Sequence, residues 1–247
     1  MNSIKRFLLA GALAVGIQPE SLSYDKTSKN LTPDAVIEIY DSSVKVQTEI
    51  TLEQRLAPLY MKQSTRQKSG SGVVLVDEDT REMYVLTADH VLPSSTGLED
   101  DKKIANSKVT IVGMDTEIYK RDVKKDLALL KLEYSFLTPF KGKLAEKQEI
   151  GDYVLGSGFP IGKPKLLYTG VISGKRKEQN IDLYTMIDAN INYGDSGGGV
   201  FVLEEGKPFL AGLILVKYKE LSGVGGMTPI SHLREFLKGT PLEDEYL

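Results

Sequence analysis

Short stretches of alternating or continuous apolar residues, separated by turn-forming residues, run along most of this chain. The segment 43–50 alternates between apolar and polar positions, which is typical of a strand with one buried face. Asp77-Glu78-Asp79 and Glu204-Glu205-Gly206 have the composition of turns between two strands. The pattern predicts an all-β fold, either a sandwich or a barrel, and not alternating β and α units. Strands are expected at 43–50, 70–76, 83–87, 108–112, 128–132, 153–156, 167–172, 183–187, 200–203 and 210–217.

Two short helices flank this β region. Thr32-Pro33-Asp34 combines an N-cap residue, a proline at the first helical position and an acid in the first turn, so a helix is expected to about Tyr40. A short amphipathic helix is expected at 231–237. A break at 141–151 divides the β region into two halves of similar size. Long polar surface loops are expected at 51–69 and 94–106.

The first residues have the form of an export signal. Lys5-Arg6 precede the apolar segment 7–17, which has the length of a signal-peptide core but is too short to span a bilayer comfortably. Ala12-Leu13-Ala14 has the small-x-small form of a cleavage site. We therefore expect a signal-like or linker segment at 1–30 and a periplasmic or secreted protein, with membrane contact only through an uncleaved apolar segment. The alternative is an amphipathic or buried N-terminal helix in a cytoplasmic protein.

The composition is ordinary for a soluble globular protein, with 41% hydrophobic and 26% charged residues among 247. The net charge is −3, so no overall basic field favours nucleic acid as a partner. The basic clusters at 120–125 and 175–177 are expected on solvated faces. The chain has no cysteine, which excludes a thiol nucleophile and disulfides, and only two histidines, which argues against a metal site. No cofactor is expected.

The glycine-rich segment 190–199 contains one serine, Ser196, with glycines at 194 and 197. Glycine permits a positive φ and a sharp turn, which lets a backbone approach another group closely. Amide N–H groups beside Ser196 could point at the oxygen of a reacting carbonyl while the hydroxyl attacks its carbon. The alternative is a glycine-rich turn with a solvated serine. The rest of the chain must decide, because a serine hydroxyl needs a base to take its proton.

His90 and Asp126 are the candidate partners of this serine. His90 follows a predicted buried strand and begins a turn, where an imidazole can be held rigidly with one face open. The third group must be an acid that accepts the other imidazole N–H and fixes its tautomer. Asp126 stands directly before the apolar run 127–132, where an unpaired charge would be costly. Asp122 lies among basic residues and is expected in a surface ion pair, while Asp89 should face away from His90 because neighbouring strand residues alternate.

A competing assembly starts from the same serine. Gly194-Asp195-Ser196-Gly197-Gly198 also fits the nucleophile elbow of α/β-hydrolases, in which the acid and the histidine follow the serine. Glu220 and His232 could take those roles. However, the elbow requires a helix directly after the serine, and 197–202 has no helical pattern. The alternating β and α pattern is also missing, which disfavours this assembly.

With His90, Asp126 and Ser196 in this order, the chain resembles a chymotrypsin-like serine protease and, within that group, the HtrA (Deg) proteases. Several ordered motifs carry the resemblance over about residues 35–238. They are Gly70-Ser71-Gly72-Val73-Val74, Leu86-Thr87-Ala88-Asp89-His90-Val91, Asp126-Leu127-Ala128-Leu129-Leu130, 156–162 with Thr169-Gly170-Val171-Ile172-Ser173, Ile187-Asp188-Ala189-Asn190-Ile191-Asn192, and Gly223-Val224-Gly225-Gly226-Met227-Thr228-Pro229-Ile230.

The resemblance implies a trypsin-like protease domain at 31–247, built from two six-stranded antiparallel β-barrels with the catalytic triad in the cleft between them. The first barrel is expected at about 43–140, the second at about 145–230 and a terminal helix at about 230–238. It further implies a serine endopeptidase that hydrolyses polypeptides through an acyl-enzyme, in protein quality control or processing.

The resemblance also assigns roles to individual residues. His90 and Asp126 would come from the first barrel and Ser196 from the second. The N–H groups of Gly194 and Ser196 would form the oxyanion hole. His90 would take the proton of Ser196 and later deliver it to the leaving amine.

Three features depart from the HtrA pattern. Asp195 stands where those proteases usually carry asparagine, and the corresponding acid of digestive and clotting proteases pairs with a new N-terminus after activation cleavage. No such activation site is visible in this sequence. Asp89 stands where a small residue is usual, and it could perturb His90. The sequence ends at Leu247, so no PDZ domain is expected. The two acids motivate an alternative, a catalytically silent protease-fold protein that binds peptides or proteins.

The sequence gives little information about the specificity pocket. Asn190 lies six residues before the serine, where trypsin-like enzymes place a pocket-bottom acid, so a preference for Lys or Arg is not supported. Leu213, Ile214 and Leu215 align with the strand that pairs with the substrate backbone. These residues predict uncharged, mainly aliphatic side chains before the cleaved bond. Assembly into a homo-oligomer is left open.

Overall fold

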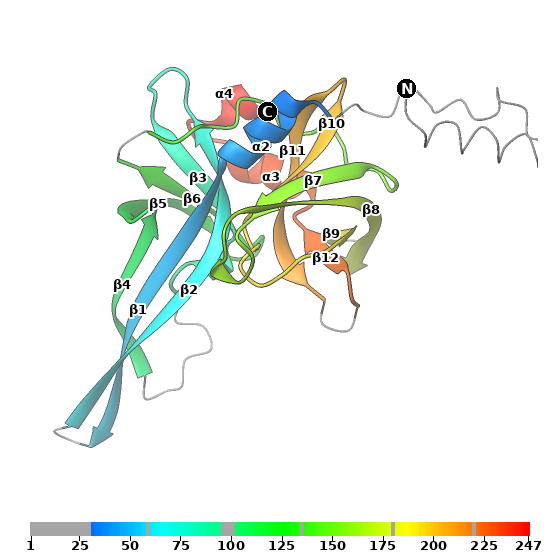
Figure 1. Ribbon diagram of the computed structural model, residues 1–247. Coiled ribbons are helices and arrows are strands. Elements are labelled where there is room, and N and C mark those ends of the chain that lie inside the picture. The colour runs from blue at the N-terminus through cyan, green and yellow to red at the C-terminus, as the bar shows by residue number, and fades with distance from the viewer. Residues whose placement is uncertain (1–30, 58–59, 95–101, 134–135, 179–180, 219–220) are drawn as a thin grey trace, which may run out of the picture.

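Two closed barrels, each of six antiparallel strands, make up the body of the protein (Figure 1). This arrangement confirms the predicted all-β fold of two six-stranded barrels. The predicted signal segment 1–30 lies outside the described residues. The computed structural model describes residues 31–57, 60–94, 102–133, 136–178, 181–218 and 221–247.

The strand order is β1-β2-β3-β6-β5-β4 in the first barrel and β10-β11-β12-β9-β8-β7 in the second. The first barrel consists of β1 (Ser43–Ala57), β2 (Tyr60–Val76), β3 (Met83–Thr87), β4 (Lys102–Ile111), β5 (Met114–Asp122) and β6 (Leu127–Leu132). The second consists of β7 (Tyr153–Gly158), β8 (Leu166–Glu178), β9 (Ile181–Ala189), β10 (Gly199–Glu204), β11 (Lys207–Lys217) and β12 (Val224–Met227). Helix α2 (Pro33–Asp41) precedes the barrels, and α3 (Ile230–Leu237) and α4 (Glu243–Tyr246) follow them.

The predicted helix start and hairpin turn are confirmed. The Thr32 hydroxyl caps α2 by accepting a hydrogen bond from the Ala35 N–H at 3.2 Å. Between β10 and β11, Glu205 and Gly206 both have positive φ, at 50° and 80°. Two such residues match the right-handed twist of the flanking strands and close a tight hairpin.

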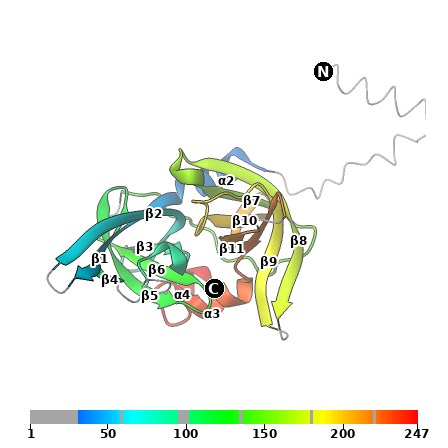
Figure 2. The same cartoon turned by 90° about the horizontal axis from the view of Figure 1, so that it is seen from below.

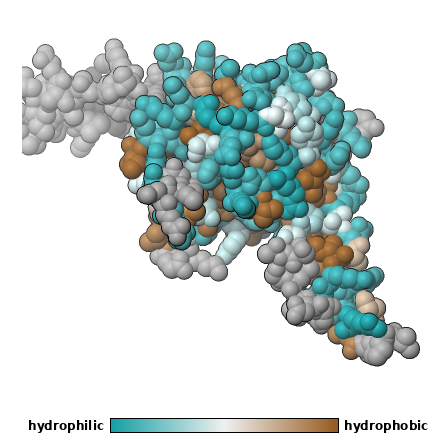
Figure 3. Space-filling model, turned by 180° about the vertical axis from the view of Figure 1, so that it is seen from behind, coloured by the Kyte–Doolittle hydropathy of each residue, from teal (hydrophilic) through white to brown (hydrophobic). Residues whose placement is uncertain are grey.

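The prediction of a long loop at 51–69 is wrong, because β1 and β2 continue through most of it as a projecting hairpin (Figure 1). The prediction failed because most residues of this segment are polar, so no regular alternation of apolar and polar positions marks a strand. Cross-strand hydrogen bonds join these polar side chains instead, from the Gln63 amide to Glu53 at 3.0 Å and from the Gln67 amide to Glu49 at 3.2 Å. The hairpin is also plain in the space-filling view, where apolar brown spots interrupt its teal surface (Figure 3).

Strand β4 begins at Lys102, inside the predicted loop 94–106, and so is longer than the predicted strand at 108–112. Three further elements, β5, β12 and α4, were not predicted. In β5 intermediate and exposed residues alternate and none is buried, so the segment carries little apolar signal. Strand β12 has only four residues, two of them glycine, and α4 is a single helical turn.

A continuous core joins the two barrels. Phe140, in the connection between them, packs edge-to-face on Phe201 of β10 with ring centroids 5.0 Å apart, and both side chains are fully buried. Residues of β2, β3 and β6 belong to the same buried cluster as residues of β10 and β11. The relative position of the barrels is therefore fixed by apolar packing.

The C-terminal helices lie across this junction, and Figure 2 shows them between the barrels. The Tyr246 hydroxyl donates to the Phe140 carbonyl at 2.8 Å and accepts from the Val76 N–H at 3.1 Å. Lys120 of β5 donates to the Phe236 carbonyl at the end of α3, at 2.6 Å. A cation at this place satisfies carbonyls that have no partner within the helix. The C-terminus thus stabilises the arrangement that the site depends on.

We predict that Phe140→Ala lowers the free energy of unfolding by about 3–5 kcal/mol, because it removes a buried ring and leaves a cavity. Urea unfolding followed by circular dichroism measures this change. Phe136→Ala is the matched control, because Phe136 is 66% exposed, and it should change the free energy by less than about 0.5 kcal/mol. Equal losses in the two variants would contradict the inter-barrel packing.

Candidate active site

His90 and Asp126 are held together at the adjacent ends of two paired strands. β3 pairs with β6 so that Thr87 lies opposite Ala128, and His90 follows Thr87 in the short turn Asp89–Val91. Asp126 directly precedes β6. Its Oδ2 lies 2.7 Å from His90 Nδ1, and its Oδ1 accepts the His90 backbone N–H at 2.8 Å. The carboxylate places the imidazole proton on Nδ1, which leaves Nε2 with a lone pair and able to act as a base.

The backbone at Asp126 is bent to reach this position. Its φ is 56°, in the left-handed region, which aspartate visits more readily than most residues. The Asp126 carbonyl also accepts the Asp89 N–H at 3.2 Å. The ring of His90 is 46% exposed, so the side away from Asp126 is open to a substrate.

Asp89, the unusual neighbour of His90, is turned away from the imidazole and paired elsewhere. Arg121 of β5 binds both of its carboxylate oxygens, through Nε to Oδ1 at 2.5 Å and through Nη2 to Oδ2 at 3.0 Å. The carboxylate also raises the pKa of the Arg121 guanidinium. Asp122 pairs with Lys125 at 3.0 Å, as expected of a surface ion pair. Asp89 and Asp122, the two alternatives to Asp126, are therefore each paired with a basic side chain.

Ser196 lies against the same strand ends, although it comes from the second barrel. Its carbonyl accepts the Ser71 N–H from β2 at 2.7 Å. The next residue, Gly197, has φ 83°, and a Cβ there would lie 2.8 Å from the Ala88 nitrogen and would overlap the Thr87 hydroxyl. Only glycine allows this approach, which brings Ser196 beside the turn that carries His90. Within the described residues, no hydrogen bond joins the Ser196 and His90 side chains.

The backbone before Ser196 is oriented by a turn in the second barrel. The Ile161 N–H donates to the Tyr193 carbonyl. The C=O and N–H of a trans peptide point in opposite directions, so the Gly194 N–H points away from Ile161. The Ser71 hydroxyl holds the other side of Gly194 by donating to its carbonyl at 2.7 Å. In the described part of the chain, the N–H groups of Gly194 and Ser196 donate to no protein acceptor, so they are available to a ligand oxygen.

Asp195 is buried between these groups, at 2% exposure. Its Oδ2 accepts the Asn192 N–H at 2.8 Å, and its Oδ1 has no hydrogen-bond partner among the described residues. Burial raises the pKa of this carboxyl to about 6, although the Asn192 N–H and the charge of Lys217 act in the opposite direction. Among the described residues, the one hydrogen bond to this carboxylate therefore comes from a backbone N–H of its own loop.

The residues predicted to bind substrate lie beside this loop. Ile214 of β11 uses both backbone groups for it, because its carbonyl accepts the Gly197 N–H at 2.7 Å and its N–H donates to Gly198 at 2.9 Å. Leu213 and Leu215 are buried in the same strand, and Asn190 is exposed. Pairing of substrate with this strand and a pocket at Asn190 stay predictions.

The elbow assembly does not fit the structure. Ser196 is followed by a turn and then by β10, with no helix. His232 lies on α3, and Glu220 is outside the described residues.

Among the described residues, no group of three or more His, Cys, Asp and Glu side chains could hold a metal ion. The helices in that same part of the chain are all too short or too polar to cross a membrane.

Sequence reasoning missed three residues that build the site. Ser71 holds two carbonyls of the serine loop, Ile161 orients the Tyr193 peptide, and Arg121 neutralises Asp89. The small residues 70–72 were visible as part of a motif, but their contacts join positions more than 120 residues apart, so no local signal gives them.

A family model described as a trypsin-like peptidase domain matches residues 70–212 of this chain. The chain belongs to the trypsin-like peptidase family. The match contains His90, Asp126 and Ser196, and it spans more than half of the chain.

Relatives of this trypsin-like chain include periplasmic proteases. The periplasmic serine endoprotease DegP of Escherichia coli (strain K12) is 28% identical over 140 residues, which cover 53% of this chain and 27% of DegP. A probable periplasmic DegP-like serine endoprotease of Pseudomonas putida (strain GB-1) is 30% identical over 156 residues, covering 60% of this chain and 30% of that protein. The chain spans less than a third of the length of these curated relatives.

Solved structures share the fold of this trypsin-like chain. The HtrA-type protease AlgW with a decapeptide has a TM-score of 0.61 at 23% identity, covering 81% of this chain and 64% of that one. The Rv3671c protease from M. tuberculosis, in its active form, has a TM-score of 0.58 at 20% identity and covers 86% of each chain.

We predict that Asp195→Asn stabilises the protein more at pH 7.5 than at pH 4.5. The folded pKa of Asp195, about 6, lies above the ordinary value of 3.8, so the wild type loses stability as the pH rises between these values and the loss persists above pH 6. The penalty is on the order of 2–3 kcal/mol. Asparagine carries no charge and keeps an oxygen that can accept the Asn192 N–H.

Thermal unfolding of both proteins at the two pH values measures this effect. The Tm of the variant minus that of the wild type should grow with pH. A difference that is constant or shrinks between pH 4.5 and 7.5 would show that the buried carboxylate is not penalised.

Proposed function

We propose that this protein is a serine endopeptidase that cleaves polypeptides through an acyl-enzyme, with His90, Asp126 and Ser196 as its catalytic residues. The observation that carries the proposal is the pair of bonds from the Asp126 carboxylate to the backbone N–H and the Nδ1 of His90. This pair fixes both the position and the tautomer of the base. Family membership and the serine endoproteases among its relatives support the reaction class.

The chemistry follows from the geometry. His90 Nε2 removes the hydroxyl proton of Ser196 as the oxygen attacks the substrate carbonyl. The N–H groups of Gly194 and Ser196 stabilise the negative oxygen of the tetrahedral intermediate. The imidazolium, stabilised by Asp126, then gives its proton to the leaving amine, and water releases the acyl group by the same steps in reverse order.

The observations that motivated a catalytically silent protein do not favour it. Asp89 is neutralised by Arg121 and does not contact the imidazole. Asp195 is held by the Asn192 N–H, and the donors at Gly194 and Ser196 remain free of protein acceptors within the described residues. We further propose export, with the signal within residues 1–30, because the similar proteases of Escherichia coli and Pseudomonas putida are periplasmic. A role in protein quality control or processing rests on the same similarity.

We predict that a fluorophosphonate probe labels the wild type and does not label Ser196→Ala, because the probe reacts with an activated serine hydroxyl. Asp126→Asn should slow labelling by about 10³- to 10⁴-fold, since the amide favours the wrong tautomer of His90. Asp122→Asn is the matched control and should label at the wild-type rate. Absence of labelling in the wild type, or equal labelling of wild type and Ser196→Ala, would overturn the proposed function.

Ser71→Ala should lower kcat for peptide hydrolysis by about 10- to 100-fold with little change in KM, because small displacements of catalytic groups are costly. The change removes the hydroxyl that donates to the Gly194 carbonyl and accepts the Phe159 N–H at 2.9 Å. Steady-state kinetics with a fluorogenic peptide measure it. Ser231→Ala, on the exposed surface of α3, is the control. A loss confined to KM would contradict a role in orienting the serine loop.

A further inference from the structure

Strand β2 has one long open edge that begins beside Ser196. The strand pairs with β1 from Tyr60 to Val73, but with β3 only from Gly72 to Val76. On the β3 side, the outer part of β2 therefore has no strand partner among the described residues. Its side chains from position 60 to 68 are all exposed.

From Ser71 outwards, every second residue of β2 directs its backbone N–H and C=O groups to this edge. The Ser71 N–H donates to the Ser196 carbonyl at 2.7 Å, and the Ser71 carbonyl accepts the Thr87 hydroxyl at 2.7 Å, so both point away from β1. Alternate residues of a strand direct their backbone groups to the same edge. Ser69, Gln67 and Thr65 thus present N–H and C=O groups along a line that starts at the candidate nucleophile. An extended peptide can add to such an edge as a further strand.

Three basic side chains follow the same edge on one face of the hairpin. Lys62, Arg66 and Lys68 occupy even positions and share a face, and Lys68 Nζ lies 3.5 Å from the His90 carbonyl. We call these three residues the basic row. Opposite them on β1 stand the uncharged residues Gln54, Ile50 and Thr48. Among the described residues, Lys62 and Arg66 make no ion pair.

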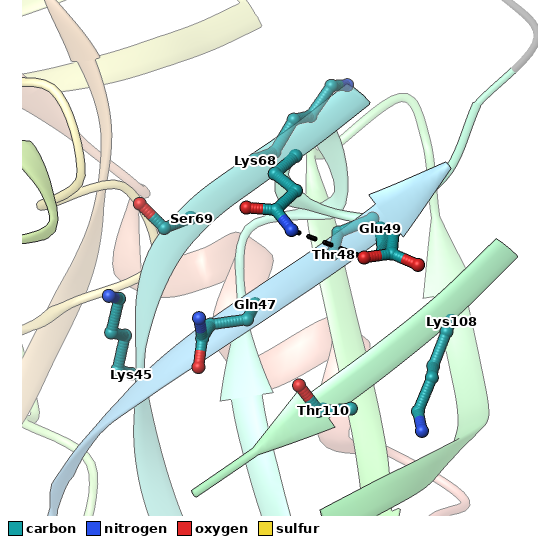
Figure 4. A pocket seen from close by; sticks show the side chains of 9 residues that line it. Lys45, Gln47, Thr48, Glu49, Lys68, Ser69, Lys108 and Thr110 are labelled. Carbon is teal, nitrogen blue, oxygen red and sulfur yellow. Dashed lines mark hydrogen bonds between the residues drawn. The ribbon is translucent and has the colours of Figure 1, made fainter. Parts of the chain in front are cut away.

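The other face of the hairpin is different, because it carries acids as well as bases. It carries Glu49 and Glu53, which accept from Gln67 and Gln63, and Lys103 lies 3.6 Å from Glu53. A polar groove of about 400 Å³ lies there, and the charged residues that line it are Lys45, Glu49, Lys108 and, from the basic row, Lys68. In Figure 4 the Lys68 side chain runs behind the β2 ribbon, whereas Ser69, Gln47 and Glu49 lie in front of it. On β2 itself, the positions on this other face are all uncharged, so within this strand the positive charge is confined to the face of the basic row.

We propose that the basic row selects acidic residues at alternate positions of the substrate segment that follows the cleaved bond, where that segment runs along the open edge of β2. The inference rests on the proposed function, since it assigns a substrate preference to the same site. A peptide leaving Ser196 along β2 places every second side chain on the face of the basic row. Acidic side chains in that phase would meet Lys68, Arg66 and Lys62, and acids in the other phase would meet the uncharged side chains of β2.

The test uses three fluorogenic peptides that are identical up to the cleaved bond. After it, one carries only glutamines, one carries two glutamates separated by a single residue, and one carries the same pair shifted by one position. The two glutamate peptides have equal net charge, so a difference between them reports the alternation of the strand. We expect kcat/KM for one of them to exceed that of the other two by about three- to tenfold at low salt, and the preference to fall towards unity in 1 M NaCl.

Charge-reversal variants test the assignment to the basic row. Arg66→Glu should abolish or invert the preference between the two glutamate peptides. Lys103→Glu is the matched control, because it makes the same charge change on the opposite face of the same sheet, and it should keep the wild-type ratio. Equal kcat/KM for the two phases in the wild type would overturn the proposal and leave the basic row as protection of an exposed edge. Loss of the preference in both variants would also overturn it.

A binding measurement separates this proposal from the proposed function. Ser196→Ala is titrated with the same peptides, labelled for fluorescence anisotropy. A phase-dependent affinity would support the β2 edge even if the wild type cleaves none of the peptides, which would count against the protease alone. Equal affinity for both phases would overturn the edge proposal. Binding of the Ser196→Ala protein to phosphatidylserine vesicles with no phase preference for peptides would assign the basic row to an anionic surface and overturn it as well.

Discussion

The site depends on one contact between the barrels, the seating of the serine loop on the ends of β2 and β3. Ser71 makes this contact twice, through its N–H to the Ser196 carbonyl and through its hydroxyl to the Gly194 carbonyl. Gly197 completes it, because any side chain there would collide with β2 and β3. The base and its acid belong to one barrel and the nucleophile to the other, so every distance in the site follows from how closely these two segments approach. The apolar junction around Phe140 and Phe201 keeps the barrels at that distance.

Buried and partly buried acids surround this contact, and the structure treats each of them differently. Asp126 is stabilised by two donors on His90, so its charge is used to orient a base. Asp89 is stabilised by two hydrogen bonds from the Arg121 guanidinium and has no part in the proposed reaction. Asp195 has one backbone donor, its other oxygen has no partner among the described residues, and burial raises its pKa to about 6. Because the buried Asp195 carboxylate has few stabilising contacts, its ionisation lowers the stability of the fold as the pH rises. This carboxylate lies next to the N–H groups proposed for the oxyanion hole.

Most of the fold and the pairing at the site could be predicted from the sequence, because both leave local marks. An apolar run bounded by turns marks β3 and β6, and the charge directly before β6 marks Asp126. A glycine on each side of Ser196 marks a backbone that must turn. Ser71, Ile161 and Arg121 leave no such mark, since a serine, an isoleucine and an arginine are ordinary on a β-rich surface. Their roles come from partners far along the chain, which only the register of the barrels determines. Strand β5 was not predicted for a related reason, because none of its side chains is buried and its sequence therefore has no apolar face.

The hairpin of β1 and β2 shows how a wrong prediction can point to function. A polar segment beyond the barrel gains little from apolar burial, so its regular structure must come from backbone pairing and side-chain hydrogen bonds across the strands. Those interactions need only one edge of β2, and the outer part of the other edge has no strand partner among the described residues. An open strand edge is a liability for aggregation, and basic residues along it reduce that liability. Here the same residues lie on the face next to His90, while the residues of β2 on the opposite face are uncharged. Protection of the edge alone gives no reason for this asymmetry, whereas an edge that guides an extended, acidic chain away from the nucleophile does.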